Sequence, residues 1–124
     1  VTDSARSTYV SRQGVCRDYA HLTATLLRAG GIPARCSSVY APGLSPMDFH
    51  LVVEALVEGR WLMVDATRLA PRASMMRIAT GQDAADTAFM TTLAGNVTLT
   101  GIQVTAVVDP ALPVEERHGR VALR

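Results

Sequence analysis

Apolar residues recur at spacings of three and four through one early stretch of the chain, which is typical of one face of a helix. The positions concerned are Val15, Tyr19, Leu22, Leu26 and Ala29. Gly30 and Gly31 follow this stretch, and Pro33 comes shortly after, as is common at a helix C-terminus. The pattern predicts a helix over residues 15–29, and the polar residues 1–13 before it are expected to form a frayed helix or a loop.

The middle of the chain changes to a strand-like pattern. Residues 49–57 (FHLVVEALV) are apolar on both faces of a pleat, as expected of a central strand. A second such run, residues 60–66 (RWLMVDA), follows after only Glu58 and Gly59, a two-residue connection typical of a tight turn. The two runs together predict a β-hairpin.

The remaining segments complete the expected architecture. Residues 34–40 (ARCSSVY) and the alternating residues 96–109 (NVTLTGIQVTAVVD) predict two further strands. Residues 83–86 (DAAD) are expected to form one helical turn with Asp83 as its cap. The charged residues 115–120 predict a solvated terminus. One helix followed by several antiparallel strands predicts an α+β domain, with the helix packed on the sheet.

Length and charge narrow the classes of function. A chain of 124 residues has room for one core and not for two independent domains. Twelve Lys and Arg against eleven Asp and Glu give a net charge of +1, which argues against a nucleic-acid surface or a polybasic membrane patch. No apolar run approaches the ~20 residues of a membrane span, and no secretory signal is visible. These signs predict a cytoplasmic protein, although a chain that begins with Val is either processed or a fragment.

The two cysteines differ in their expected surroundings. Two are too few for a disulfide scaffold. Cys16 falls in the first turn of the predicted helix, where free backbone N–H groups and the helix dipole stabilise a thiolate. The same N–H groups can later hold an oxyanion. Cys36 lies in a predicted strand without such a feature, so Cys16 is the candidate nucleophile, and a buried apolar filler is the alternative role.

The predicted hairpin brings a histidine and a carboxylate together. If the loop has two residues, Val52 faces Asp65 and His50 faces Thr67. His50 and Asp65 are then diagonal neighbours on one face, about 7–8 Å apart at the backbone. A carboxylate beside an imidazole selects its tautomer and stabilises the imidazolium. A loop one residue longer would place the two on opposite faces, so the hypothesis depends on the register.

Several spaced motifs resemble the bacterial transglutaminase-like superfamily. They are GVCRDYAHL at 14–22, GIPAR at 31–35, DFH at 48–50 with Glu54, Trp61, VDAT at 64–67 and RIATGQDAADTAF at 77–89. The resemblance covers roughly residues 9–108. It implies a papain-like α+β core in which Cys16 is the nucleophile, His50 the base and Asp65 the orienting carboxylate. It also implies acyl transfer through a thioester, for which we expect no cofactor and no metal.

The implied mechanism assigns further groups around the thiol. The backbone N–H of Cys16 is expected to hold the oxyanion, with Gln13 as a possible second donor, and Tyr40 is expected to line the cleft. The substrate is expected to be a protein, peptide or amide. The sequence does not decide between water and a lysine-like amine as the acyl acceptor. We favour a protease or amidase over a cross-linking enzyme, and no oligomeric state is predicted.

The chain departs from the family pattern in two places. Members often have His-Ala-Trp-Val-Glu where residues 50–54 are HLVVE, and Asp-Pro-Thr where residues 65–67 are DAT. Related bacterial proteins usually carry an additional N-terminal β domain, which this sequence lacks. We therefore expect residues 1–124 to be a single catalytic core from a longer protein.

Three alternatives remain open at this point. A zinc site built from Cys16, Cys36, His21 and His50 is disfavoured because the spacing of the two cysteines matches no compact ligand pair. His21 lies five residues after Cys16 and so points away from the thiol's face of the helix. A Cys16–Cys36 disulfide would silence the nucleophile. A non-catalytic binding module that retains the fold is the third alternative.

Overall fold

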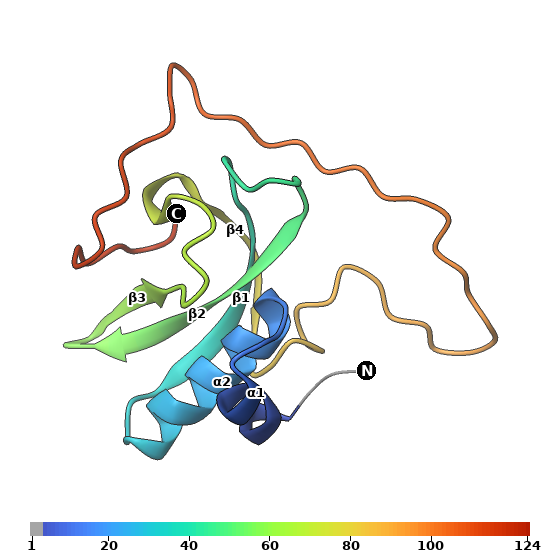
Figure 1. Cartoon of the computed structure of the whole chain (residues 1–124), viewed down its shortest axis with the longest axis horizontal. Helices are drawn as coiled ribbons and strands as arrows, with labels where there is room; N and C mark the ends of the chain where they lie inside the picture. The colour runs from blue at the N-terminus through green and yellow to red at the C-terminus, as the bar shows by residue number, and fades with distance from the viewer. Residues whose placement is uncertain (1–3) are drawn as a thin grey trace.

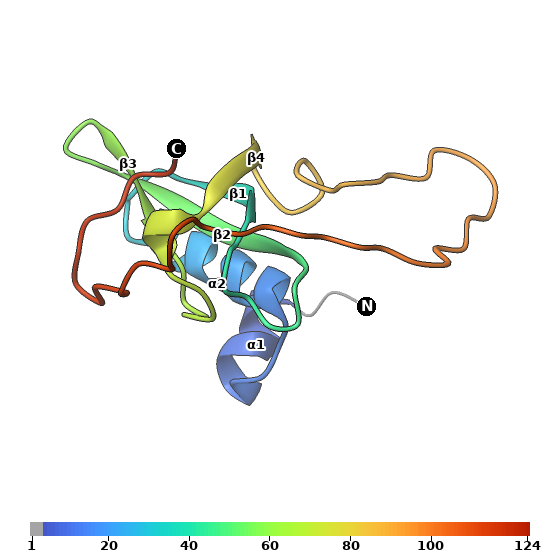
Figure 2. The same ribbon diagram turned by 90° about the horizontal axis from the view of Figure 1, so that it is seen from above.

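The computed structural model describes residues 4–124 and has two helices on one face of a four-stranded antiparallel sheet (Figure 1). The elements are α1 (Ala5–Ser11), α2 (Cys16–Ala29), β1 (Ala34–Tyr40), β2 (Phe49–Val57), β3 (Arg60–Val64), a short 3-10 helix (Arg72–Ser74) and β4 (Met76–Gly81). The strand order is β3-β2-β1-β4, and both helices lie on the same side of the sheet (Figure 2). The predicted α+β class is confirmed. The polar N-terminal segment forms α1, and residues 1–3 lie outside the described residues.

Helix α2 begins where the sequence predicts. Val15 is its N-cap, and the side chain of Asp18 accepts a hydrogen bond from the backbone N–H of Val15 at 2.9 Å. Gly14 is required here because a Cβ on it would lie 2.7 Å from the Cβ of Asp18. The helix ends at Gly30, as expected. Cys16 is therefore the first residue of a 14-residue helix.

The buried face of α2 is not the predicted one. Val15 and Leu26, which the spacing pattern placed on the buried face, are 66% and 55% exposed. The residues that contact the sheet are Cys16, Ala20, Ala24 and Leu27, and they pack with Cys36, Leu51 and Val53. The two alanines are small enough to let the helix lie close to the strands. This close packing turns the alanine side of α2 toward the sheet and leaves larger side chains such as Leu26 exposed.

The hairpin of β2 and β3 forms with the predicted register, in which Leu56 pairs with Trp61. Glu58 and Gly59 have φ angles of 51° and 76°, and these left-handed conformations make the two-residue turn. Strand β3 ends at Val64, two residues earlier than predicted. The chain leaves the ladder at Asp65, whose carboxylate accepts a hydrogen bond from the backbone N–H of Thr67.

The fourth strand of the sheet was not predicted from sequence. Strand β4 pairs with β1 through a bulged register, in which Ser38 pairs with Ala79 and Val39 pairs with Arg77. The expected helical turn at residues 83–86 is a turn without helix, although Asp83 does accept a hydrogen bond from the backbone N–H of Ala85 at 2.9 Å.

The prediction of a long strand over residues 96–109 is wrong. This segment has no ladder partner in the described part of the chain, and it lies within a long coil that extends away from the sheet (Figure 1). Its alternating pattern survives only as partial burial of every second residue, at positions 104, 106 and 108. Alternation alone does not make a strand where no neighbouring strand supplies the hydrogen bonds.

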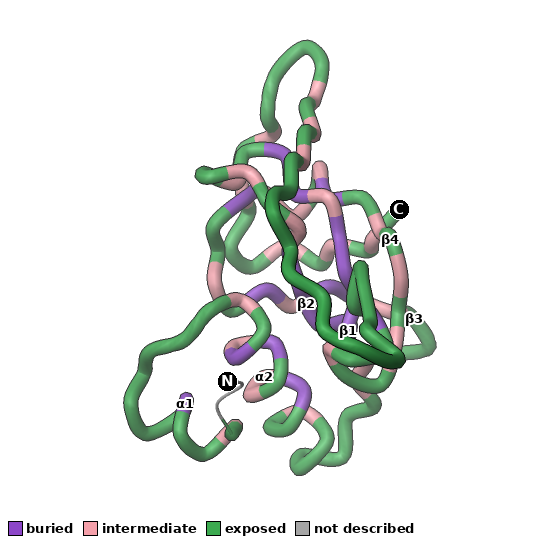
Figure 3. Tube along the Cα trace, turned by 90° about the vertical axis from the view of Figure 1, so that its right-hand side faces the viewer, coloured by how far each residue is buried: buried purple, intermediate pink, exposed green. Residues whose placement is uncertain are grey.

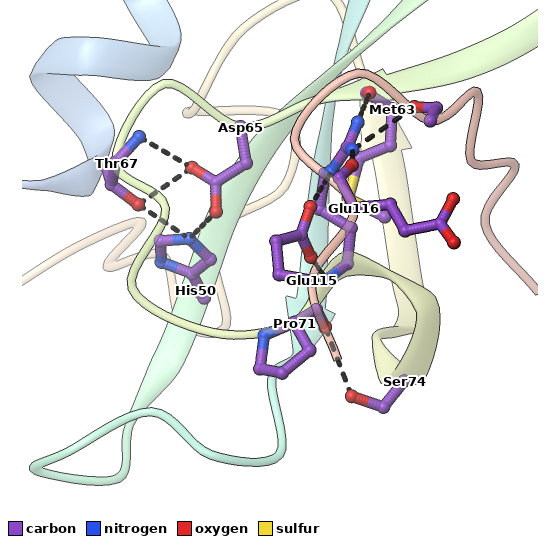
Figure 4. A network of polar contacts seen from close by, with 10 residues as sticks. His50, Met63, Asp65, Thr67, Pro71, Ser74, Glu115 and Glu116 are labelled. Carbon is purple, nitrogen blue, oxygen red and sulfur yellow. Dashed lines mark hydrogen bonds and ion pairs between the residues drawn. The ribbon is translucent and has the colours of Figure 1, made fainter. Parts of the chain in front are cut away.

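A second core lies on the sheet face opposite α2. Its buried members are Val39, Ala41, Val52, Met63, Ala70 and Met75, and Val121 and Leu123 from the C-terminal segment pack against them. The stretch predicted to be solvated, residues 115–120, is mostly exposed, but it is anchored at Glu115. Glu115 accepts hydrogen bonds from the backbone N–H and the Nε of Arg72 at 2.7 and 2.6 Å (Figure 4). Burial is concentrated where α2, β1 and β2 meet (Figure 3). No helix within residues 4–124 is long and apolar enough to cross a membrane.

Candidate active site

The thiol of Cys16 lies where the edge of β2 is uncovered. Strand β3 pairs with β2 only from Val53 onward, so the start of β2 has no partner on that side. Burial raises the pKa of the Cys16 thiol, but hydrogen bonding from His50 and from the backbone N–H of Leu51 and Arg17 outweighs it. The positive charge of His50 acts in the same direction. The net result is a pKa below the ordinary value, which favours the thiolate.

His50 is held from its other side by a carboxylate and a hydroxyl (Figure 4). Its Nε2 lies 3.0 Å from Oδ2 of Asp65, and both side chains are almost fully buried. Thr67 contacts both side chains. Its hydroxyl donates a hydrogen bond to Oδ1 of Asp65 at 2.7 Å and lies 3.3 Å from Nε2 of His50. An Nε2–H directed at Asp65 leaves Nδ1 as the ring nitrogen that serves Cys16.

The charges of these three groups support one another. Burial of the ring lowers the pKa of His50, but hydrogen bonds and charge interactions with Asp65 and Cys16 raise it from 6.5 to about 9. Burial likewise opposes ionisation of Asp65, whose pKa is nevertheless lowered by hydrogen bonds from His50 and Thr67. At neutral pH the arrangement therefore favours a thiolate on Cys16, an imidazolium on His50 and a carboxylate on Asp65.

A cleft of about 560 Å³ opens beside the thiol. Cys16 and His50 line it together with residues from the start of α2, from β1 and β4, and from the segment after β4. Its aromatic wall is formed by Tyr40, Phe49 and Phe89. The rings of Tyr40 and Phe49 are 5.9 Å apart, and Phe89 stacks on Phe49 at 5.5 Å. The cleft can therefore accept an apolar group next to the nucleophile.

The other residues singled out from sequence fall in different places. Tyr40 lines the cleft, whereas Gln13 is exposed and is not among the lining residues. Cys36 is a buried free thiol, and burial, the largest influence, raises its pKa. His21 is exposed on α2. Cys16 is also free, and residues 4–124 contain no cluster of three or more His, Cys, Asp or Glu side chains that could hold a metal ion.

The family relationship follows from comparison with known proteins. The family described as the transglutaminase-like superfamily matches residues 1–66, a stretch that contains Cys16, His50 and Asp65. This chain belongs to the transglutaminase-like superfamily. None of the curated proteins matches it.

A solved structure extends the likeness of this transglutaminase-like chain. It is the crystal structure of a proposed cysteine protease from Cytophaga hutchinsonii, with 53% sequence identity and a TM-score of 0.65. The match covers 67% of this chain and 29% of that protein, so the chain spans less than a third of its relative's length. The two comparisons support a transglutaminase-like fold for this chain.

Some contacts of this transglutaminase-like site were not assigned from sequence. Thr67 has a local signal, because an Asp followed two residues later by Thr commonly closes a turn in which the carboxylate binds the later residue. No local sequence signal indicates the roles of the backbone N–H of Leu51 and the ring of Phe89. The first depends on where β3 ends, and the second depends on how the segment after β4 folds back over β2.

Proposed function

We propose that this chain is a cysteine-dependent amidase or peptidase whose catalytic residues are Cys16, His50 and Asp65. The observation that carries the proposal is the position of His50, which is held by Asp65 at 3.0 Å and lines the same cleft as Cys16. Supporting it, the environment lowers the pKa of the thiol and raises that of the imidazole. We further propose that residues 1–124 act as one catalytic core within a longer protein.

The first half-reaction forms a thioester. The Cys16 thiolate attacks the carbonyl carbon of an amide, and the C–S bond forms as the carbonyl oxygen takes up the electron pair. The backbone N–H of Cys16, at the start of α2, is the proposed donor to this oxyanion. His50 then gives its proton to the nitrogen, the C–N bond breaks, and an amine leaves. Asp65 and Thr67 keep the imidazole oriented during the proton transfer.

The second half-reaction releases the acyl group. His50, now neutral, takes a proton from the acceptor, which attacks the thioester carbonyl, and the thiolate of Cys16 leaves. With water as the acceptor the product is a carboxylic acid, and with a primary amine it is a new amide. The description of the C. hutchinsonii relative as a cysteine protease favours water. The proposed substrates are proteins, peptides or small amides.

A substrate screen tests the reaction type. Purified protein is incubated with peptide and amide libraries in the presence and absence of a primary amine such as a lysine analogue, and the products are identified by mass spectrometry. We expect free carboxylic acids as the main products in both conditions, in line with the description of the relative as a cysteine protease.

The same screen can also contradict the proposed hydrolysis. If amine adducts dominate whenever the amine is present, the protein is a transamidase and the hydrolytic assignment is wrong. A Cys16→Ala protein, incubated in parallel, reports any activity from a contaminating enzyme. No product of either kind from the unsubstituted protein, against clean controls, would favour the binding module.

A further inference from the structure

A hydroxyl in the cleft has no partner. Within residues 4–124, two buried side-chain polar atoms lack a hydrogen bond, Oγ of Ser38 and Nε of Arg77. The second belongs to a guanidinium that already binds Glu54 through another nitrogen. Ser38 has no such compensation and is only 8% exposed. A buried hydroxyl without a partner is unfavourable in a folded protein and calls for an explanation.

The position of Ser38 connects it to the thiol. Ser38 lies in β1 directly opposite Leu51 of β2, the residue whose backbone N–H interacts with the sulfur of Cys16. It also lines the cleft that Cys16 and His50 line. A substrate main chain that extends along this cleft from the sulfur therefore passes the hydroxyl of Ser38.

The neighbouring serine shows what a purely structural serine looks like in this strand. Ser37 points to the opposite face of the sheet, where its hydroxyl donates to Oε2 of Glu54 at 2.6 Å. The fold thus provides a buried partner for one serine and leaves the adjacent one unpaired toward the cleft. An apolar residue would fill the position of Ser38 without the desolvation cost of a hydroxyl.

We infer that Ser38 is a substrate-binding residue, whose hydroxyl forms a hydrogen bond with the main chain of the acyl donor next to the bond that reacts. This inference rests on the proposed function, because it takes the acyl donor to bind beside Cys16. The hydroxyl acts on the substrate and does not act on the thiol. Its removal should therefore weaken reaction with a peptide and leave the intrinsic reactivity of Cys16 unchanged.

The test compares two reagents that alkylate the same thiol. Dipeptidyl chloromethyl ketones present a peptide main chain, and their C–S bond forms as chloride leaves. Iodoacetamide presents almost no substrate main chain and reports the thiolate alone. The protein with Ser38→Val is compared with Ser38→Thr, since Val and Thr have nearly the same shape and differ in the hydroxyl. The ketone used is the one of a panel that inactivates the unsubstituted protein fastest.

We expect Ser38→Val and Ser38→Ala to react with the ketone about tenfold more slowly, the effect of one lost hydrogen bond. Ser38→Thr should recover most of the rate, and all three variants should keep the iodoacetamide rate within about twofold. Ser38→Ala should unfold at the same or a higher temperature, because the lost hydroxyl had no partner. The control Ser37→Ala should lower the unfolding temperature and leave both rates unchanged.

Two results would overturn the inference. The first is an unchanged ketone rate in Ser38→Ala and Ser38→Val. The second is a parallel fall in the ketone and iodoacetamide rates, which would show that the hydroxyl acts on the thiol. Failure of the proposed function gives a different result, in which no ketone of the panel reacts with the unsubstituted protein faster than with a free cysteine.

Discussion

Replacing His50 by Ala is expected to lower kcat/KM for amide hydrolysis by about 10⁴-fold, and replacing Cys16 by Ala is expected to abolish hydrolysis. Without His50 the thiolate loses its largest stabilising contact, and the leaving amine loses its proton donor. Asp65→Asn should cost a similar factor, because an amide at that position would present a donor to Nε2 and select the wrong tautomer. The measurement is steady-state hydrolysis of the best substrate from the amide and peptide screen.

Two controls make this prediction specific. His21→Ala removes an exposed imidazole from the same helix as Cys16 and should leave kcat/KM unchanged. A protein with both Cys16→Ala and His50→Ala should be no less active than Cys16→Ala alone, because residues of a catalytic unit are not additive. Retention of more than a tenth of the activity in His50→Ala, with the fold intact, would show that His50 is not the base.

The second large effect concerns a buried carboxylate on β2, four residues from His50. The side chain of Glu54 is fully buried and accepts hydrogen bonds from Arg35 at 2.9 Å, from Ser37 at 2.6 Å and from Arg77. Arg35 also lies over the ring of Trp61, 4.2 Å from its centroid. These contacts join β1, β2, β3 and β4 on the face opposite α2. Glu54 therefore links β2 directly to β1 and β4, and to β3 through Arg35.

Glu54→Gln should reduce the free energy of unfolding by about 3 kcal/mol, because it leaves two arginines facing a neutral amide. That value is at the low end for a broken buried pair, since the arginine side chains are 29% and 31% exposed. Burial raises the pKa of Glu54, but the hydrogen bonds from Arg35, Ser37 and Arg77 lower it overall. The stability that Glu54 contributes is therefore present above its ordinary pKa and is lost as the pH falls through the lowered value.

Urea denaturation of Glu54→Gln and of Glu58→Gln provides the matched comparison. Glu58 forms an exposed ion pair with Arg120 at 2.9 Å, so its substitution should change the free energy of unfolding by less than about 1 kcal/mol. Equal effects of the two substitutions would contradict the role given to Glu54. At temperatures where the Glu54→Gln protein remains folded, its alkylation at Cys16 should be normal.

The site was predictable because its geometry depends on short-range rules. The spacing of apolar residues and the glycines after Ala29 predict a helix over residues 15–29, which places Cys16 in its first turn. The two residues Glu58 and Gly59 fix the register of the hairpin, which is paired from Val57 and Arg60 to Val53 and Val64. His50 and Asp65 lie just beyond the last pair, and their side chains meet at 3.0 Å. Such local signals are strong because they depend on backbone sterics and on a repeat of two or three to four residues.

The features that the sequence did not predict depend on contacts between distant segments. The buried face of α2 is set by which side chains fit against the sheet, and Ala20 and Ala24 fit better than Leu26. The pairing of β4 with β1 passes through a bulge that no local pattern indicates. The alternation over residues 96–109 shows β propensity, but propensity cannot show whether a partner strand is present.

The central claim is that His50 keeps Cys16 ionised, and the alkylation rate of Cys16 as a function of pH tests it most directly. The rate with iodoacetamide, followed by mass spectrometry of the Cys16 peptide, measures the thiolate. The thiolate population should persist below the ordinary thiol pKa of ~8.5, down to the lowered pKa of Cys16. Cys36, buried and with a raised pKa, serves as the unreactive control in the same sample.

In His50→Ala the inflection should move to higher pH, since burial still opposes ionisation while the imidazolium that countered it is gone. Below both inflections, each unit of the shift lowers the rate about tenfold. The difference should close only above the inflection of the His50→Ala protein, where Cys16 is ionised in both proteins. An ordinary thiol profile that is the same in both proteins would contradict the account.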